Sequence, residues 1–402
     1  MIIRDIYQKL KDNLKNDYIL LLIGARQTGK TYLLKQLQKE LKKDQVTVNF
    51  FTFEDPLFLS EINNHPENIF HFITKGKKLI LLLDEIQYLN NPSNFLKYIY
   101  DSYQKTIKII ATGSSAFYLD QKFKDSLAGR KRIFEIQTLN FSEFIRAKKL
   151  DYYLEKIQSN YLVSKQKRSW LIPEKQHLSQ LFTEYTLYGG YPRVVLAEDL
   201  EEKQNTLREL YFSFLKKDFF EAGIKNETKM YQLLNILAAQ AGSLINLQEL
   251  ANTLNIAHQT IENYCYVLEK SFIIKRISPF SQNLRKELTK MPKYYFFDLG
   301  LRNIILNDFK QISERLDSGA FLENIFCRIL LDLNVANIQF WRTQNKNEVD
   351  FIVNKELAFE VKLRKQNFSL NKYQIFKSSY PDLPLKLVTW EDQIELDMLD
   401  FI

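Results

Sequence analysis

Residues 24–31, GARQTGKT, decide the fold of the first third of this chain. They follow YILLLI, an apolar run of strand length, and precede YLLKQLQKEL, in which leucines recur at helical spacing. Strand, glycine-rich turn and helix in this order match the phosphate-binding loop G-x-x-x-x-G-K-[ST]. The alternative is a chance glycine turn before a helix, and the flanking strand and helix argue against it.

Each position of this loop has a chemical role. Gly24 and Gly29 let the backbone approach a ligand closely, and the loop amides can point at β-phosphate oxygens at the positive end of the helix. Those amides belong to Gln27, Thr28, Gly29, Lys30 and Thr31. Lys30 would reach the β and γ phosphates, and the hydroxyl of Thr31 would hold a magnesium ion. The loop therefore predicts ATP and Mg²⁺ as cofactors.

Two acids end a later strand-like run. KKLILLLDEI at residues 77–86 is continuously apolar before Asp84, which is typical of a strand buried on both faces of a parallel sheet. Asp84 and Glu85 would lie at the carboxyl edge of the sheet, where ligands bind in open α/β folds. Asp84 fits a second magnesium anchor beside Thr31, and Glu85 fits the catalytic base that orients the attacking water. Two solvated acids at a strand end are the alternative.

Three further runs complete the predicted sheet, at residues 46–55, 106–115 and 131–139. Five strands separated by helical segments predict an α/β fold with the doubly wound parallel sheet of a P-loop ATPase. Thr112, Ser114 or Ser115 would contact the γ-phosphate from a neighbouring strand tip. A plain turn at residues 113–114 explains these small residues equally well.

Five short motifs occur in order within residues 24–144: GARQTGKT, LILLLDEIQ, ATGSS, LAGR and LNFSEF. Together they resemble the AAA-type ATPases of prokaryotes that carry a C-terminal restriction-endonuclease-like domain of unknown function. The resemblance implies that Arg130, from LAGR, is a catalytic arginine finger that acts in cis or from a neighbouring subunit of a homo-oligomer. A solvated strand start at residues 130–132 is the alternative.

Residues 141–225 are predicted to form a helical lid, interrupted by YGGYPRVVL at residues 188–196. The resemblance implies that Gly190 and Pro192 border the adenine of bound ATP. A helix-breaking turn explains the same glycines and proline.

Residues 226–290 predict a winged helix-turn-helix, because three short helical patterns precede a hairpin that begins at IIKRISPF. The third helix would present four outward residues to a major groove: His258, Gln259, Glu262 and Asn263. This face carries a glutamate and no arginine, so a packing module between two working domains is an equal alternative. Nearby cations favour contact with DNA phosphates: Lys270, Lys275, Arg276, Arg285 and Lys286.

Residues 291–402 resemble the PD-(D/E)xK nuclease fold. Strand alternation in LAFEVKL places Glu360 and Lys362 on one face, and Asp350 lies in the preceding strand. Glu323 interrupts the apolar face of the helix before them. Asp350, Glu360 and Glu323 would bind a metal ion that activates water, and catalytic Lys362 would hold the nucleophile or offset phosphate charge. Charged strand ends without chemistry are the alternative, and a retained fold does not ensure retained cleavage.

Composition and charge limit where these domains are expected to act and which partners they can bind. The chain has 402 residues and a formal net charge of +8, which permits a polyanionic partner such as DNA. No apolar run reaches the roughly 18 residues of a membrane span, and the first ten residues carry charges. Cys265 and Cys327 fall in apolar helical patterns, which is typical of reduced, buried thiols. We therefore expect a cytoplasmic protein with no membrane association.

The sequence predicts four parts: an ATPase core at residues 1–140, a helical lid at 141–225, a winged helix at 226–290 and a nuclease-like domain at 291–402. The predicted function is that of a magnesium-dependent, ATP-hydrolysing AAA-type ATPase that acts on DNA through the last two parts. A nucleotide-gated switch or scaffold that binds DNA or protein without cleavage is the alternative.

Overall fold

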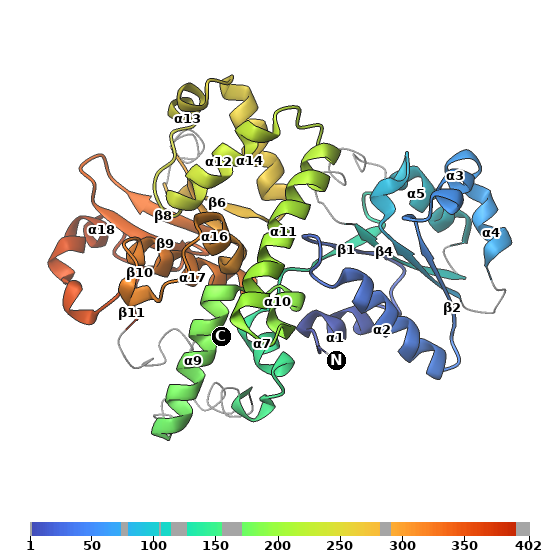
Figure 1. Ribbon diagram of the computed structural model, residues 1–402, viewed down its shortest axis with the longest axis horizontal. Coiled ribbons are helices and arrows are strands. Elements are labelled where there is room, and N and C mark those ends of the chain that lie inside the picture. The colour runs from blue at the N-terminus through green and yellow to red at the C-terminus, as the bar shows by residue number, and fades with distance from the viewer. Residues whose placement is uncertain are drawn as a thin grey trace.

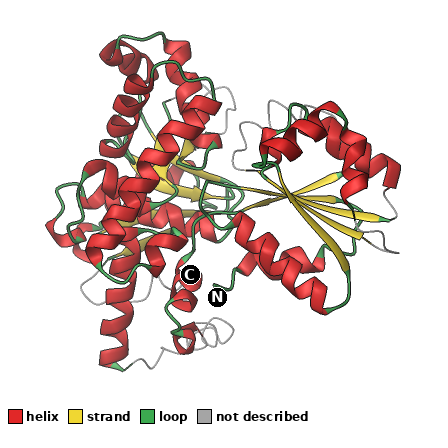
Figure 2. Cartoon of the chain, turned by 45° about the vertical axis from the view of Figure 1, so that its right-hand side comes forward, coloured by secondary structure: helices red, strands yellow, loops and turns green. Residues whose placement is uncertain are grey.

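The computed structural model describes residues 2–73, 79–103, 106–113, 127–154, 171–281 and 291–390. Its first part is a twisted parallel sheet between helices, at the right of Figure 1 and seen as a fan of strands in Figure 2. The strand order is β2-β3-β4-β1-β5. The elements are α1 (Asp5–Asp12), β1 (Ile19–Ile23), α2 (Lys30–Lys43), β2 (Thr47–Thr52), α3 (Pro56–Asn64), α4 (Ile69–Phe72), β3 (Leu79–Asp84), α5 (Pro92–Tyr103), β4 (Ile107–Gly113) and β5 (Lys131–Glu135).

The central strand β1 is buried on both faces. Leu20 and Leu22 pack in one hydrophobic cluster with leucines of α2, whereas Leu21 packs in the cluster on the other face. In the parallel register Ile23 lies opposite Gly113, so the carboxyl ends of neighbouring strands share one edge. The predicted five-stranded parallel α/β sheet is confirmed.

A helical region follows the first sheet. Its helices are α7 (Phe141–Ala147), α9 (Ile172–Tyr188), α10 (Pro192–Leu196) and α11 (Leu200–Glu221). Asn140 caps the N-terminus of α7 with a capping box. Its side-chain oxygen accepts from the backbone amide of Glu143, and the carboxylate of Glu143 accepts from the backbone amide of Asn140. Helix α11 has 22 residues and stands at the centre of Figure 1.

Three more helices lead into a second sheet. They are α12 (Glu227–Ala239), α13 (Leu247–Leu254) and α14 (His258–Lys270), and the antiparallel strands β6 (Ile274–Pro279) and β7 (Lys293–Phe296) come next. These two strands belong to a six-stranded mixed sheet of order β11-β10-β9-β8-β6-β7. Its other elements are α16 (Leu299–Leu306), α17 (Ser318–Asp332), β8 (Ile338–Arg342), β9 (Glu348–Val353), β10 (Leu357–Lys362), α18 (Gln374–Ser379) and β11 (Leu385–Thr389).

Helices cover both faces of this second sheet. Phe326 of α17 packs against Phe351 and Phe359, whereas Ala358 packs with Phe376 of α18 on the other face. Cys265 and Cys327 are both buried and free, as predicted. Across the described residues, no helix combines the length and apolar character needed to span a bilayer.

Candidate nucleotide site and C-terminal carboxylates

The phosphate-binding loop has the predicted form of a turn that leads into a helix. Gly29 has φ 95°, a left-handed conformation that favours glycine, and it precedes the first residue of α2. A Cβ added to Gly24 would lie 2.0 Å from the carbonyl oxygen of Ile136, just after β5. Gly24 is therefore required by packing inside the protein as well as by any ligand.

Lys30 lies folded over its own loop. Its Nζ donates to the carbonyl oxygens of Gly24 at 2.9 Å and Ala25 at 2.7 Å, and the residue is only 3% exposed. Burial lowers the pKa of Lys30 to about 8, although the nearby Glu85 carboxylate opposes the shift. The ammonium is thus held beside the loop with little water around it.

The predicted metal anchors meet at the carboxyl edge of the sheet. The hydroxyl of Thr31 donates to Asp84 Oδ2 at 2.8 Å, and the hydroxyl of Thr112 donates to Asp84 Oδ1 at 2.5 Å. Burial raises the pKa of Asp84, and the two hydroxyl donors oppose that rise. A hydroxyl and a carboxylate at this spacing fit a magnesium ion, which prefers oxygen ligands.

Glu85 is held at the edge of the same site. Its amide donates to Thr112 Oγ1 at 3.0 Å, and its carboxylate accepts from the side-chain amide of Gln87. Its backbone is left-handed, with φ 57°. Thr112 therefore touches both acids, whereas Ser114 and Ser115 lie outside the described residues.

A cavity of about 850 Å³ opens over the loop. Its lining includes loop residues 26–31 and Glu85, together with Pro192, Arg193 and Lys217 from the helical region. The structure thus brings Pro192 to the cavity with Gln27, Thr28 and Thr31. Gly190 has a packing role, because an added Cβ would lie 2.1 Å from the Leu139 carbonyl oxygen.

Sequence reasoning missed a cluster of charges behind the loop. Arg26 is ion-paired with Asp218 and, at 2.5 Å, with Glu221, and both acids belong to α11. Asp218 is buried, and its second oxygen, Oδ2, has no hydrogen-bond partner among the described residues. Burial raises the pKa of Asp218, against the opposing effect of Arg26. The loop motif leaves the residue at position 26 unspecified, so it gave no signal for this pair.

Arg130 lies away from the cavity. It immediately precedes β5, and its carbonyl accepts from the amide of Ile19, the first residue of β1. Its guanidinium pairs with Asp101 at 2.9 Å. The loop follows the opposite end of β1, so the expected finger does not reach the nucleotide cavity of its own chain.

The outward face of α14 is mostly exposed, as predicted. Gln259, Glu262 and Asn263 are exposed, and His258 lies 3.8 Å from the carboxylate of Glu262. Lys270, Lys275 and Arg276 lie within the described residues, whereas Arg285 and Lys286 do not.

The C-terminal carboxylates that were predicted to bind metal accept hydrogen bonds from neighbouring protein groups. Glu323 Oε2 accepts from the Tyr295 hydroxyl at 2.7 Å and from Lys293 Nζ at 3.2 Å. Burial and the neighbouring Asp350 raise the pKa of Glu323 to about 7, and Lys293 opposes this rise. Asp350 Oδ2 accepts from the Val361 amide at 2.8 Å.

Lys362 is bonded to Glu360 and lies 3.6 Å from Asp350 Oδ2. Among the described residues, no group of three or more His, Cys, Asp or Glu side chains is placed to hold a metal ion. A buried lysine, Lys293, engages Glu323 on the side of α17. The role of Glu323, Asp350 and Glu360 as metal ligands stays a prediction.

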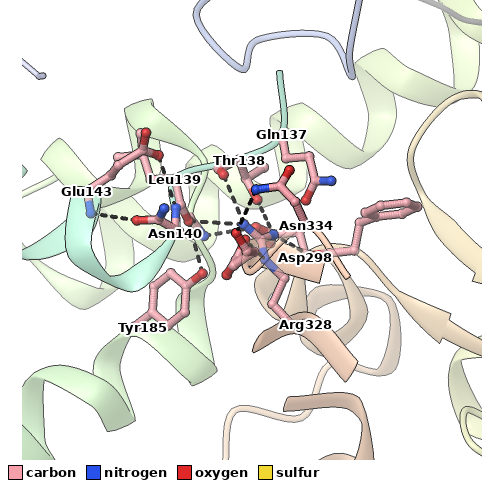
Figure 3. Close-up of polar contacts among 12 residues, drawn as sticks. Gln137, Thr138, Leu139, Asn140, Glu143, Tyr185, Asp298, Arg328 and Asn334 are labelled. Atoms are coloured by element: carbon pink, nitrogen blue, oxygen red, sulfur yellow. Dashed lines mark hydrogen bonds and ion pairs between the residues drawn. The ribbon is translucent and has the colours of Figure 1, made fainter. Parts of the chain in front are cut away.

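A buried polar junction joins the two halves of the chain, and Figure 3 shows Arg328 at its centre. Arg328 of α17 donates to the Thr138 hydroxyl at 2.6 Å and to the Thr138 carbonyl at 2.9 Å, and it pairs with Asp332 at 2.9 Å. Asp298 accepts from the amide of Gly190 at 2.8 Å. Residues of the segment after β5, the helical region and the second sheet thus share one network.

The same segment also supports the phosphate-binding loop. Arg4 donates to the carbonyl oxygens of Gln137 and Thr28, each at 2.7 Å, and pairs with Glu143 at 3.0 Å. One buried arginine therefore ties the loop to the residues that Arg328 holds.

Three stretches of the chain match models of known protein families. Residues 16–145 match the family model of an AAA domain, and residues 179–311 and 318–399 match two domains of unknown function, DUF8612 and DUF4143. An uncharacterized protein of Methanocaldococcus jannaschii is 28% identical over 411 residues, covering 97% of this chain and 85% of that protein. One of Haemophilus influenzae is 26% identical over 383 residues, covering 90% and 88%.

Similar solved structures include AMPPCP-bound DnaA from Aquifex aeolicus, with 20% identity, a TM-score of 0.30, and coverage of 67% of this chain and 89% of that one. Cdc6p from Pyrobaculum aerophilum has 13% identity, a TM-score of 0.32, and coverage of 76% and 95%. Residues 16–145 are thus similar to an AAA domain, and residues 179–311 and 318–399 are similar to two regions found in other proteins.

Proposed function

We propose that this chain binds ATP with magnesium at residues 24–31 and hydrolyses it. One observation carries the proposal: Lys30, Thr31 and Glu85 line a single cavity of about 850 Å³, and Thr31 is bonded to Asp84 at 2.8 Å. The AAA-domain match over residues 16–145 supports the same chemistry.

The loop residues would act mainly by positioning and by charge. The ammonium of Lys30 would exchange its two carbonyl partners for β- and γ-phosphate oxygens. Thr31 and Asp84 would hold a magnesium ion, which would supply positive charge to offset that of the phosphates. Glu85 would accept a proton from the attacking water, and Thr112 and Gln87 fix its position.

Turnover assays on four proteins test this proposal. We expect Lys30→Ala to lose ATP turnover, and Glu85→Gln to fall by at least about 100-fold, because a positioned general base contributes roughly that much. Lys39→Ala is the matched control, since Lys39 is exposed on the same helix α2 and should leave turnover unchanged. Absence of turnover in the wild type, with or without DNA, would contradict hydrolysis.

Arg130 enters this proposal only as a group supplied to a neighbouring chain. Its place at the start of β5 keeps it from its own cavity. In the same assay, Arg130→Ala and Lys30→Ala should each be inactive, and mixing the two should restore turnover if the protein is a homo-oligomer. Unchanged turnover in Arg130→Ala would remove Arg130 from the proposal.

We also propose that α12–α14 with strands β6 and β7 act as a winged helix on DNA. Lys270, Lys275 and Arg276 lie at the end of α14 and in β6, where they would contact phosphates. Lys275→Ala with Arg276→Ala should weaken binding to all DNA sequences alike and should reduce the salt dependence of binding, by about one unit of slope for each phosphate that is no longer neutralised. Equal binding by this variant and the wild type would exclude DNA binding through these residues.

A second candidate is a nucleotide-gated switch that does not depend on turnover. The ion pairs between Arg26 of the loop and Asp218 and Glu221 of α11 favour it, because they join the cavity wall to the helix that precedes α12. Glu85→Gln separates the two candidates. A switch would keep ATP-dependent changes in DNA binding in this variant, whereas a hydrolysis-driven protein would lose them.

A further inference from the structure

The C-terminal domain contains a cluster of four carboxylates, those of Glu323, Glu348, Asp350 and Glu360. What we infer from this cluster does not depend on ATP hydrolysis. A magnesium ion in a nuclease site of the PD-(D/E)xK architecture needs several oxygen ligands that converge on one point. Phe359 packs against Phe326 of α17, so strand alternation turns Glu360 away from the helix that carries Glu323. Asp350 is the carboxylate that neighbours both Glu323 and Glu360 in this cluster.

On the side of the cluster nearest α17, the ammonium of Lys293 supplies the positive charge that balances the buried carboxylates. Its side chain is only 2% exposed, and its Nζ lies 3.2 Å from Glu323 Oε2 and 2.5 Å from Glu348 Oε1. The ammonium also lies 5.4 Å from the centre of the Phe340 ring. A buried ammonium with two carboxylates and an aromatic wall is well satisfied without any further ligand.

The remaining acids are also paired. Lys362 engages Glu360 and Asp350, and Arg342 pairs with Glu348 at 2.6 Å. Four carboxylates therefore face three cationic side chains, so little negative charge is left to attract a divalent cation. The Oε2 atom of Glu360 has no hydrogen-bond partner among the described residues, but magnesium requires about six ligands and this atom offers a single one.

We propose that the ammonium of Lys293 takes the place of the metal ion in this cluster. It neutralises Glu323 and ties β7 to α17 and β9, and the domain carries out no metal-dependent cleavage. The described acids of this cluster thus form an internal salt-bridge network in place of a divalent-cation site.

Manganese titration of the full chain tests this assignment. All proteins carry Asp84→Asn, which removes the carboxylate at the other site, and free Mn²⁺ is followed by electron paramagnetic resonance. We expect the Asp84→Asn protein to bind no Mn²⁺ at the C-terminal cluster. Adding Lys293→Met should create one Mn²⁺ site per chain, and adding Asp350→Asn as well should abolish it again.

Two outcomes would overturn the proposal. If Asp84→Asn protein binds Mn²⁺ and Asp84→Asn with Asp350→Asn does not, the native cluster is a metal site despite Lys293. If neither the parent nor the Lys293→Met protein binds Mn²⁺, Lys293 is not what replaces the metal. The comparison of Asp84→Asn with Asp84→Asn plus Asp350→Asn needs no change at Lys293. It therefore decides the question even if Lys293→Met fails to fold.

Nicking of supercoiled plasmid with Mn²⁺ gives a second readout on otherwise wild-type protein. We expect the wild type and Asp350→Asn to be equally inactive. Nicking by the wild type that Asp350→Asn removes would overturn the proposal. The nicking assay contains no ATP, so its result does not depend on the nucleotide site. Failure of the ATPase proposal is therefore distinguishable from failure of this one.

Discussion

Burial makes the charge of Lys30, in the candidate nucleotide site, sensitive to pH. Its burial lowers its pKa from 10.5 to about 8, so the neutral amine becomes the main form above that pH. Only the ammonium attracts phosphate. The affinity of the chain for ATP should therefore be highest below about pH 7 to 8 and fall as pH rises, by up to about ten-fold per unit above the pKa.

Titration with a fluorescent ATP analogue across this pH range measures the effect. Lys30→Arg is the matched control, because a guanidinium keeps its proton throughout and its affinity should stay level. Level affinity in the wild type would show that Lys30 is not the titrating group.

Part of the candidate nucleotide site could be predicted from the amino-acid sequence alone. The motif predicted Lys30 and Thr31, and the acids after an apolar run predicted Asp84, because these residues lie within local patterns whose geometry is fixed. The partner of Arg26 was not predictable, since Arg26 and Asp218 are 192 residues apart and no local pattern spans such a distance. Lys293 looked only like the start of a buried strand, because its ion pairs come from α17 and β9.

At the scale of elements, the ion pairs between the loop and α11 are the main test. Arg26→Met would leave Asp218 buried without its cation, which should lower the free energy of unfolding by about 3–5 kcal/mol. Adding Asp218→Asn should recover part of this loss, because the uncompensated charge is then removed. Urea unfolding measures both variants.

Lys217→Met is the control for this prediction. Lys217 neighbours Asp218 on α11, but its pair with Glu54 is half exposed and 3.7 Å long, so its loss should matter little. Equal losses in Arg26→Met and Lys217→Met would show that the buried pair does not hold the loop to α11.

Strands were predictable as elements, but their grouping was not. Apolar runs and alternation located all five strands of the first sheet to within a few residues. The predicted boundary between residues 290 and 291 falls between β6 and β7, which are hydrogen-bonded to each other. Strand pairing across such a boundary depends on tertiary packing, which no periodicity encodes.

At the scale of the whole molecule, we expect Arg328 to make the two halves of the chain unfold together. Its guanidinium bonds Thr138, beyond the first sheet, from a helix that packs on the second. Arg328→Met should lower the free energy of unfolding by about 3 kcal/mol or more, because Asp332 and several backbone carbonyls would lose their buried cationic partner. It should also split one calorimetric transition into two.

Differential scanning calorimetry checks this, with Arg208→Met as the control. Arg208 is exposed on α11 and bonds only locally, to Asn205 at 2.9 Å. A single unshifted transition in Arg328→Met would show that the halves are joined by other interactions.

The shared second sheet sets a limit on how this protein can move. Strand β6 is paired with β7 on one side and with β8 on the other, through Ser278 and Pro279. Backbone ladders resist bending, so the three helices ahead of β6 and the sheet behind it cannot swing apart without breaking hydrogen bonds. A conformational change that starts at the nucleotide site would therefore move α12–α14 and the second sheet as one rigid body. The hinge of such a motion would lie nearer to α11.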